Sequence, residues 1–272
     1  MLRSGKAEGI PYSLSRWTDV PASKWAWLES CLQSQQMVAI DPRSGAPGVW
    51  SLKPEDTLGL VFWTKDPSLL IASQLRLDPY HVTVNVTATG WGEVEKGAPT
   101  LYESGELLLE TAEAFQHVYW RFSPIPALPK FTVLERFCTL LAYAHKAKLT
   151  EVFVSFLQPN DRIPEVRTPQ ERFELLNQMS GMAAQYGIEV KLCRDDRSFA
   201  DWQGAKFSAG ICVPQSDFPG ATRPEDCGCT LMVDPFTINE SCQFGCQYCY
   251  AADQGLASKK NNSTRRLKVV TP

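Results

Sequence analysis

Residues 151–156 read EVFVSF, residues 168–186 read TPQERFELLNQMSGMAAQY, and residues 188–192 read IEVKL. The first and last stretches are short runs of apolar and β-branched residues, which predicts buried strands. The middle stretch opens with Thr168 followed by proline, a typical start of a helix, and a glycine follows its end. This order predicts two parallel strands joined by a helix.

The same alternation precedes this unit. Further strand-like runs cover residues 12–15, 57–63, 81–87 and 117–121. Helix-like stretches cover residues 21–35, 107–115 and 132–148. Six such runs predict an α/β fold of the partial (β/α)6-barrel type. An open doubly wound sheet is the alternative, although no glycine-rich phosphate loop follows any strand-like run.

The pattern of alternating strand-like and helix-like stretches ends near residue 197. Residues 197–240 carry proline, glycine, aspartate and scattered aromatic residues without a period. We therefore expect a barrel core over residues 1–196 and an irregular cysteine-rich segment over 197–272. The two would form one structural unit, with the second segment docked on the barrel mouth and a last short strand over residues 265–270.

The bulk composition limits the class of protein. The chain has 272 residues, 44% hydrophobic residues, a net charge of −3 and nine cysteines. We expect no membrane span and no signal peptide, and hence a cytoplasmic protein. A reducing compartment makes disulfides rare, so closely spaced cysteines indicate metal binding. The charge does not indicate nucleic-acid binding.

Residues 242–249 read CQFGCQYC, a C-x3-C-x2-C spacing. Three thiolates in so short a loop suit a 4Fe–4S cluster, because each ligates one iron and the fourth iron stays open. The expected ligands are Cys242, Cys246 and Cys249. Part of a zinc ribbon is the alternative, but no histidine lies nearby to complete a zinc site.

The spacing, with an aromatic residue before the last cysteine, resembles the signature of the radical-SAM superfamily. The resemblance implies that the open iron binds S-adenosylmethionine, that a 5′-deoxyadenosyl radical is formed, and that Tyr248 contacts adenine. It also implies a flavodoxin- or ferredoxin-type electron donor. Because the loop usually follows the first barrel strand, its late position implies a permuted barrel.

Four other blocks carry a closer resemblance, to a family of radical-SAM-like proteins defined only as a domain of unknown function. They are SRWTDVPA at 15–22, VFWTKDP at 61–67, WRFSPI at 120–125 and YCYAA at 248–252. The chain departs from the family pattern at Trp17, where arginine is usual, and at Ser123, where aspartate is usual. These departures bear on the substrate if those positions touch it.

The blocks fall at the ends of predicted strands, where β/α barrels place their chemistry. We therefore expect four charged residues at one mouth, in contact with substrate or cofactor: Arg16, Asp19, Lys65 and Arg121. Asp19 has a simpler interpretation as a helix cap, and the arginines as internal ion pairs. Trp17 and Trp63 are candidates for stacking on adenine or substrate.

Four more cysteines match the family pattern and lie in or near the irregular segment: Cys193, Cys212, Cys227 and Cys229. They predict a second metal site, with a second 4Fe–4S cluster as first choice and zinc as second. Buried free cysteines are the simplest alternative, and the one we favour for Cys31 and Cys138.

Three functions compete. The leading hypothesis is a radical-SAM enzyme that abstracts hydrogen from a small-molecule, amino-acid or nucleotide substrate. The second is a non-catalytic iron–sulfur or zinc module for electron transfer or structure. A zinc-stabilised barrel hydrolase is the third, and it lacks a plausible His/Glu metal centre.

Overall fold

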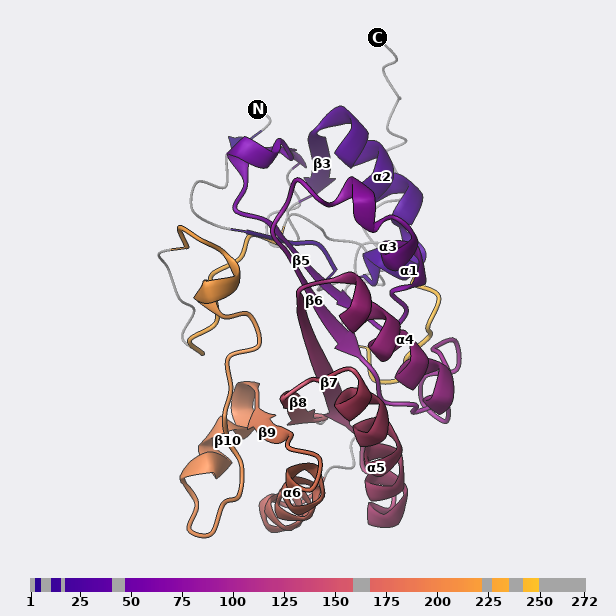
Figure 1. Ribbon diagram of the computed structural model, residues 1–272, viewed down its shortest axis with the longest axis vertical. Coiled ribbons are helices and arrows are strands. Elements are labelled where there is room, and N and C mark those ends of the chain that lie inside the picture. Colours follow the sequence, from indigo (N-terminus) through magenta and orange to yellow (C-terminus); the bar gives the residue numbers. More distant parts are fainter. Residues whose placement is uncertain are drawn as a thin grey trace, which may run out of the picture.

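A seven-stranded parallel sheet forms the centre of the molecule in the computed structural model (Figure 1). Every neighbouring pair of its strands is parallel. The expected α/β class is therefore confirmed. The structure describes residues 3–5, 11–15, 18–40, 47–158, 167–221, 227–234 and 242–249.

The strands lie side by side in chain order, β2, β5, β6, β7, β8, β9 and β10. This order has no reversal, whereas the strand order of a doubly wound sheet reverses at a switch point. Closure into a barrel is not seen within the described ranges, where β2 and β10 are the two edges of the sheet. The strands are β2 (Tyr12–Ser13), β5 (Leu60–Thr64), β6 (Val82–Thr87), β7 (His117–Ile125), β8 (Glu151–Phe156), β9 (Glu189–Leu192) and β10 (Ser208–Ala209).

Helices connect these strands and cover one face of the sheet. They are α3 (Ser68–Ala72), α4 (Leu101–Ala114), α5 (Lys130–Lys146) and α6 (Pro169–Ala184). Figure 1 shows α3, α4 and α5 along one side of the strands. Thr168 and Glu171 form a capping box at the start of α6, as the sequence around residue 168 predicts. Beneath the helices, the stacked rings of Trp120 and Phe137 lie 5.4 Å apart in the main core.

The opposite face of the sheet, called here the second face, is covered by the segment that follows β10, drawn in orange in Figure 1. Side chains alternate along a strand, so Leu60 and Phe62 enter the main core while Val61 points to the second face. There Val61 and Phe153 pack with Phe218 in a second apolar cluster. The second face therefore has its own small core, built partly from the irregular segment.

The irregular segment contains little regular structure, as expected. Asp217 fixes it to the second face, because its carboxylate accepts hydrogen bonds from the Thr83 hydroxyl at 3.0 Å and the Tyr119 hydroxyl at 3.1 Å. The Nδ1 atom of His117 lies 3.3 Å from the same carboxylate. The short 3-10 helices of the chain are η1 (Pro54–Asp56), η2 (Gln74–Arg76), η3 (Arg194–Asp201) and η4 (Gln215–Asp217).

The N-terminal part forms a separate small sheet that the sequence did not predict, in the order β1-β4-β3. Its strands are β1 (Arg3–Gly5), β3 (Gln36–Ile40) and β4 (Pro47–Ser51). The single helix expected over 21–35 is two helices, α1 (Val20–Ser23) and α2 (Trp25–Ser34), which meet at Lys24. No helix among the described residues is long and apolar enough to cross a membrane. The strand expected over 265–270 lies outside the described residues.

Candidate functional site: two cysteine groups at the sheet

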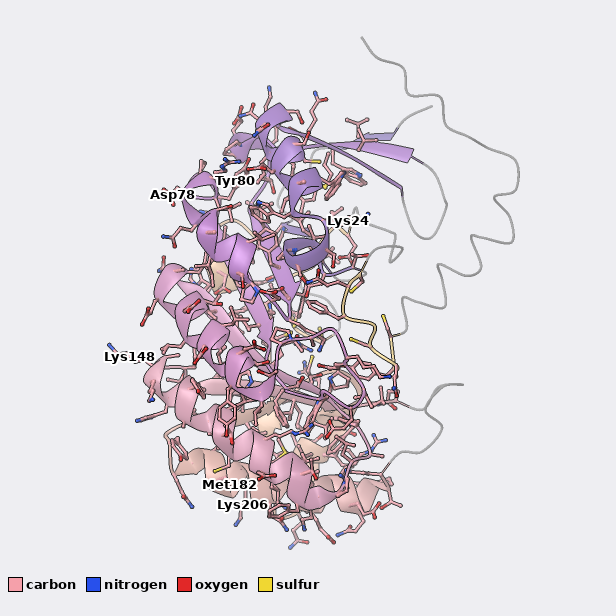
Figure 2. All side chains as sticks on the ribbon, turned by 90° about the vertical axis from the view of Figure 1, so that its right-hand side faces the viewer. Lys24, Asp78, Tyr80, Lys148, Met182 and Lys206 are labelled. Atoms are coloured by element: carbon pink, nitrogen blue, oxygen red, sulfur yellow. The ribbon has the colours of Figure 1, made fainter. Side chains whose placement is uncertain are left out.

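The three-cysteine loop, residues 242–249, lies against the loop that follows β6. The Gly97 N–H donates to the Phe244 carbonyl at 3.1 Å, and the Gln247 N–H donates to the Val94 carbonyl at 2.9 Å. At its other end the Gln243 N–H donates to the Ser23 hydroxyl at 3.2 Å. Figure 2 shows this yellow segment on the same side of the molecule as the labelled Lys24. The loop is therefore held from two sides by backbone hydrogen bonds.

A buried ion pair lies beside this loop. Lys65 follows β5, and its Nζ atom is 2.8 Å from the Glu95 carboxylate, whose side chain is only 1% exposed. Both groups hydrogen bond the Tyr248 hydroxyl, and the Thr89 hydroxyl donates to Glu95 at 3.1 Å. Burial acts to lower the pKa of Lys65, but the charges of Glu95 and Cys246 outweigh it and raise that pKa. Lys65 is therefore a fixed positive charge next to a cysteine of the loop.

Asp19 acts mainly as a structural residue. As expected for a helix cap, its carboxylate accepts a hydrogen bond from the Ala22 N–H at 3.2 Å. It also accepts from the Thr64 hydroxyl at 2.8 Å and the Lys65 N–H at 2.7 Å. Burial raises the pKa of Asp19 to about 7, against the opposing effect of these hydrogen bonds. Asp19 thereby connects α1 to the end of β5 and holds the backbone of Lys65.

The three thiols of the loop are half-buried and lie within electrostatic range of one another. Burial raises the pKa of Cys246 to about 12, although the charge of Lys65 opposes this. Burial likewise raises the pKa of Cys242, although its sulfur accepts a hydrogen bond from the backbone N–H of Asp19, which acts to lower that pKa. In the part of the chain that the structure describes, no three His, Cys, Asp or Glu side chains already converge on a single point as ligands of one ion would.

A second group of thiols, called here the four-cysteine group, lies on the second face of the sheet. It comprises Cys193, Cys212, Cys227 and Cys229, and three of these belong to the apolar cluster there. The Cys212 sulfur lies 4.0 Å from that of Cys193 and 3.7 Å from that of Cys229. Hydrogen bonds from the Cys212 thiol and from the Val213 N–H lower the pKa of Cys229 to about 6, although burial opposes them.

Arg121 faces the four-cysteine group. Its guanidinium stacks on the Trp63 ring, 5.0 Å from the ring centroid. Burial acts to lower the pKa of Arg121, but its interactions with Cys193 and Cys212 raise it. Of the charged residues expected at one mouth, Lys65 and Asp19 thus belong to the three-cysteine loop and Arg121 to the other group. Arg16 and Trp17 lie outside the described residues.

Two side chains that were predicted to contact a cofactor, Tyr248 and Trp63, interact with protein groups in the structure. The Tyr248 hydroxyl is bound to Glu95 and Lys65. The indole N–H of Trp63 donates to the Ser13 hydroxyl at 3.1 Å, and Arg121 covers its ring. Stacking of adenine on Trp63 would have to take place on the other ring face. Both contacts stay predictions.

The family model for a domain of unknown function (DUF1848) matches residues 12–251. The chain belongs to this family. No curated protein matches it. Among solved structures, the xylose isomerase domain protein from Planctomyces limnophilus is similar, with 15% sequence identity and a TM-score of 0.27. The match covers 45% of this DUF1848 chain and 47% of that protein, so the chain spans about half of its length. A likeness this small carries no argument about fold or function.

Sequence reasoning missed Glu95 and Asp217 in this DUF1848 protein. Glu95 is a buried carboxylate in the loop after β6, and loops after parallel strands are where site residues gather. Its position after a strand could therefore have predicted Glu95, which lies outside the four family-like blocks. Asp217 carried no comparable signal, because its role depends on a segment folding back onto Thr83 and Tyr119.

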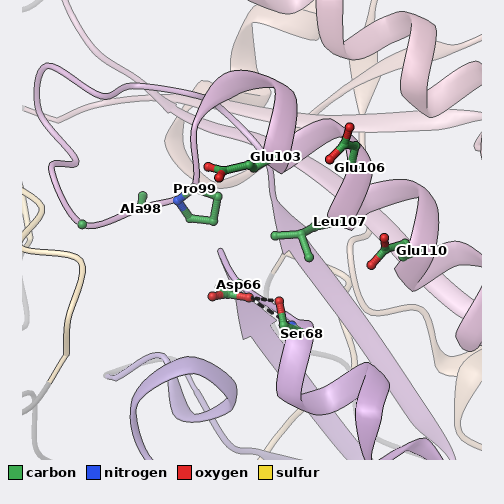
Figure 3. A pocket seen from close by; sticks show the side chains of 9 residues that line it. Asp66, Ser68, Ala98, Pro99, Glu103, Glu106, Leu107 and Glu110 are labelled. Atoms are coloured by element: carbon green, nitrogen blue, oxygen red, sulfur yellow. Dashed lines mark hydrogen bonds between the residues drawn. The ribbon is translucent and has the colours of Figure 1, made fainter.

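A surface groove of about 390 Å³ lies between α3 and α4, next to Gly97. Figure 3 shows the carboxylates of Asp66, Glu103, Glu106 and Glu110 around it. Asp66 accepts hydrogen bonds from Ser68, and Glu103 belongs to the capping box of α4. The four negative charges make the groove unsuitable for an anionic ligand.

Proposed function

We propose that this chain is a radical-SAM enzyme with a 4Fe–4S cluster on Cys242, Cys246 and Cys249. The observation that carries the proposal is the position of the three-cysteine loop at the ends of β5 and β6, beside the fixed charge of Lys65. When bound, such a cluster supplies one electron to S-adenosylmethionine, whose C5′–S bond breaks to give methionine and a 5′-deoxyadenosyl radical.

The thiols suit a cluster of this kind. In a cubane each thiolate binds a different iron, so the sulfur atoms need not converge on one point. The three thiols are close enough to interact, and each residue is half-buried. The charge of Lys65 favours the thiolate of Cys246, although burial outweighs that effect in the metal-free protein.

Residues around the loop have separate tasks in this proposal. Lys65 offsets the negative charge of the thiolates and any carboxylate bound nearby. Glu95 fixes Lys65 and the Tyr248 hydroxyl, and Thr89 fixes Glu95. Asp19 holds the Lys65 backbone. The substrate would be a small molecule, amino acid or nucleotide, and a flavodoxin or ferredoxin would deliver the electron.

The test is anaerobic reconstitution with iron and sulfide. We expect the electron paramagnetic resonance signal of the reduced cluster to change when S-adenosylmethionine is added, and 5′-deoxyadenosine to form with dithionite. Cys246→Ala should abolish both, whereas Cys138→Ala, which alters a half-buried thiol of α5, should change neither. Bound iron with no spectral change and no 5′-deoxyadenosine would instead favour the non-catalytic module.

A further inference from the structure

The four-cysteine group gathers thiols from three separate parts of the chain. Cys193 directly follows β9, Cys212 follows β10, and Cys227 and Cys229 flank one glycine in a turn. Arg197 brings these parts together, because its guanidinium donates to the carbonyls of Gly210 and Cys227. The thiols therefore lie where the irregular segment meets the sheet, near the ends of β9 and β10.

Two sulfur distances at Cys212 suit a tetrahedral ion, although in the structure as it stands no three of the described thiols are gathered around one point. A tetrahedral ion that binds thiolates at about 2.3 Å keeps their sulfur atoms roughly 3.8 Å apart. The two observed distances, 4.0 Å and 3.7 Å at Cys212, lie on either side of that value. A disulfide cannot account for both, since Cys212 approaches two sulfurs and its S–S bond would measure about 2.0 Å. Thiolates on a cubane would be spread over separate irons.

The buried charge of Arg121 also favours a bound metal ion. Its Nη1 atom is buried without a hydrogen-bond partner, and within the described ranges no carboxylate forms an ion pair with this residue. Its polar neighbours are Cys193 and Cys212. Neutral thiols do not offset a buried cation, whereas four thiolates on one divalent ion carry a net charge of −2.

We propose that Cys193, Cys212, Cys227 and Cys229 hold one divalent metal ion of the zinc type in a closed tetrahedral site, with Arg121 as the positioning residue that offsets its charge. The site fixes the irregular segment to the second face of the sheet. Because all four positions of the ion are taken by thiolates, it performs no chemistry. The proposal does not depend on radical chemistry at the three-cysteine loop.

The first experiment is a metal count on the full-length protein purified without added iron. We expect close to one zinc per chain, lost in Cys229→Ser and kept in Cys246→Ser. Replacement of the metal by Co²⁺ in the unaltered protein should give the intense visible absorption of tetrahedral thiolate coordination. Four irons with sulfide that disappear in Cys229→Ser but not in Cys246→Ser would overturn the proposal in favour of a second cubane. The proposal would also be overturned if the purified protein contained no metal and did not bind added Co²⁺.

The role of Arg121 is tested by metal affinity, measured in competition with a chromophoric chelator. Arg121→Met should weaken zinc binding by about 10- to 100-fold, as is usual when a residue behind the ligands is lost. Arg121→Lys should restore most of the affinity, because it keeps the charge. Equal affinity in Arg121→Met and the unaltered protein would refute charge compensation, and circular dichroism of each variant separates this readout from misfolding.

Discussion

The N–H of Gly97 donates a hydrogen bond to the carbonyl of Phe244, which joins the loop after β6 to the three-cysteine loop. The side chain of Phe244 is buried, with only 2% of its surface exposed. The three-cysteine loop has almost no secondary structure of its own. Its position therefore depends on this contact and on the neighbouring hydrogen bonds of Gln243 and Gln247.

Gly97→Ala should displace the three-cysteine loop. A Cβ atom at residue 97 would lie 2.3 Å from the Gln243 carbonyl oxygen, which is too close for any relaxed contact. We expect iron incorporation after reconstitution to fall several-fold while the sheet stays folded. Gly92→Ala is the matched control, because nothing lies within 4 Å of a Cβ there. Equal iron content in both variants would show that the loop does not need this contact.

Glu95→Gln should destabilise the protein by about 3 kcal/mol, since it leaves the buried Lys65 without its counterion. Glu93→Gln provides the comparison, because Glu93 is half-exposed and pairs with Arg136 at the surface. Its cost should be about 0–1 kcal/mol. Urea denaturation of both variants measures the difference. Similar midpoints for the two would mean that Lys65 is solvated rather than paired.

Asp217→Ala should loosen the irregular segment on the second face. The Thr83 and Tyr119 hydroxyls would lose their acceptor, at a cost of about 1–3 kcal/mol for the buried Thr83 and less for the half-buried Tyr119. We expect faster proteolysis near residue 217 and a lower denaturation midpoint. Asp201→Ala, at an exposed position, should behave like the unaltered protein. Unchanged proteolysis in Asp217→Ala would contradict the role given to this carboxylate.

Two helix glycines should respond in opposite directions. A Cβ atom at Gly105 in α4 would lie 2.4 Å from the Tyr143 ring of α5, so Gly105→Ala should force the two helices apart and lower the melting temperature. At Gly181 in α6 the space is open, and Gly181→Ala should stabilise the protein by about 0.5–1 kcal/mol. Thermal denaturation of the two variants checks the sign of each effect.

Six strands of the main sheet were predictable because they lie in runs of apolar, β-branched or aromatic residues, whereas the two-residue β10 (Ser208–Ala209) was not predicted. Each of the six predicted runs overlaps a strand of the main sheet, and the start of α6 at Thr168 is marked by its capping residues. The small sheet of β1, β3 and β4 was not predicted. Its β1 pairs with β4, a segment far away in the sequence, and local patterns do not record such pairing.

The site was predictable only in part for a related reason. Cysteine spacing predicts the ligands proposed for the three-cysteine loop, but it does not show which charges lie beside them. Lys65 directly follows β5 and Arg121 lies within β7, and the two residues face different cysteine groups. Strand twist and the path of the irregular segment separate them, and both are properties of the folded chain.

The chain order of the strands has a consequence for biosynthesis. Strands β2 to β8 pair with neighbours that have already been made, whereas all the cysteines of both groups lie after β8. A growing chain can therefore build most of its sheet before it contains a single ligand thiol of either group. Insertion of the proposed metals would then be a late step on a preformed surface, and a shortage of metal should yield a folded but incomplete protein rather than an aggregated one.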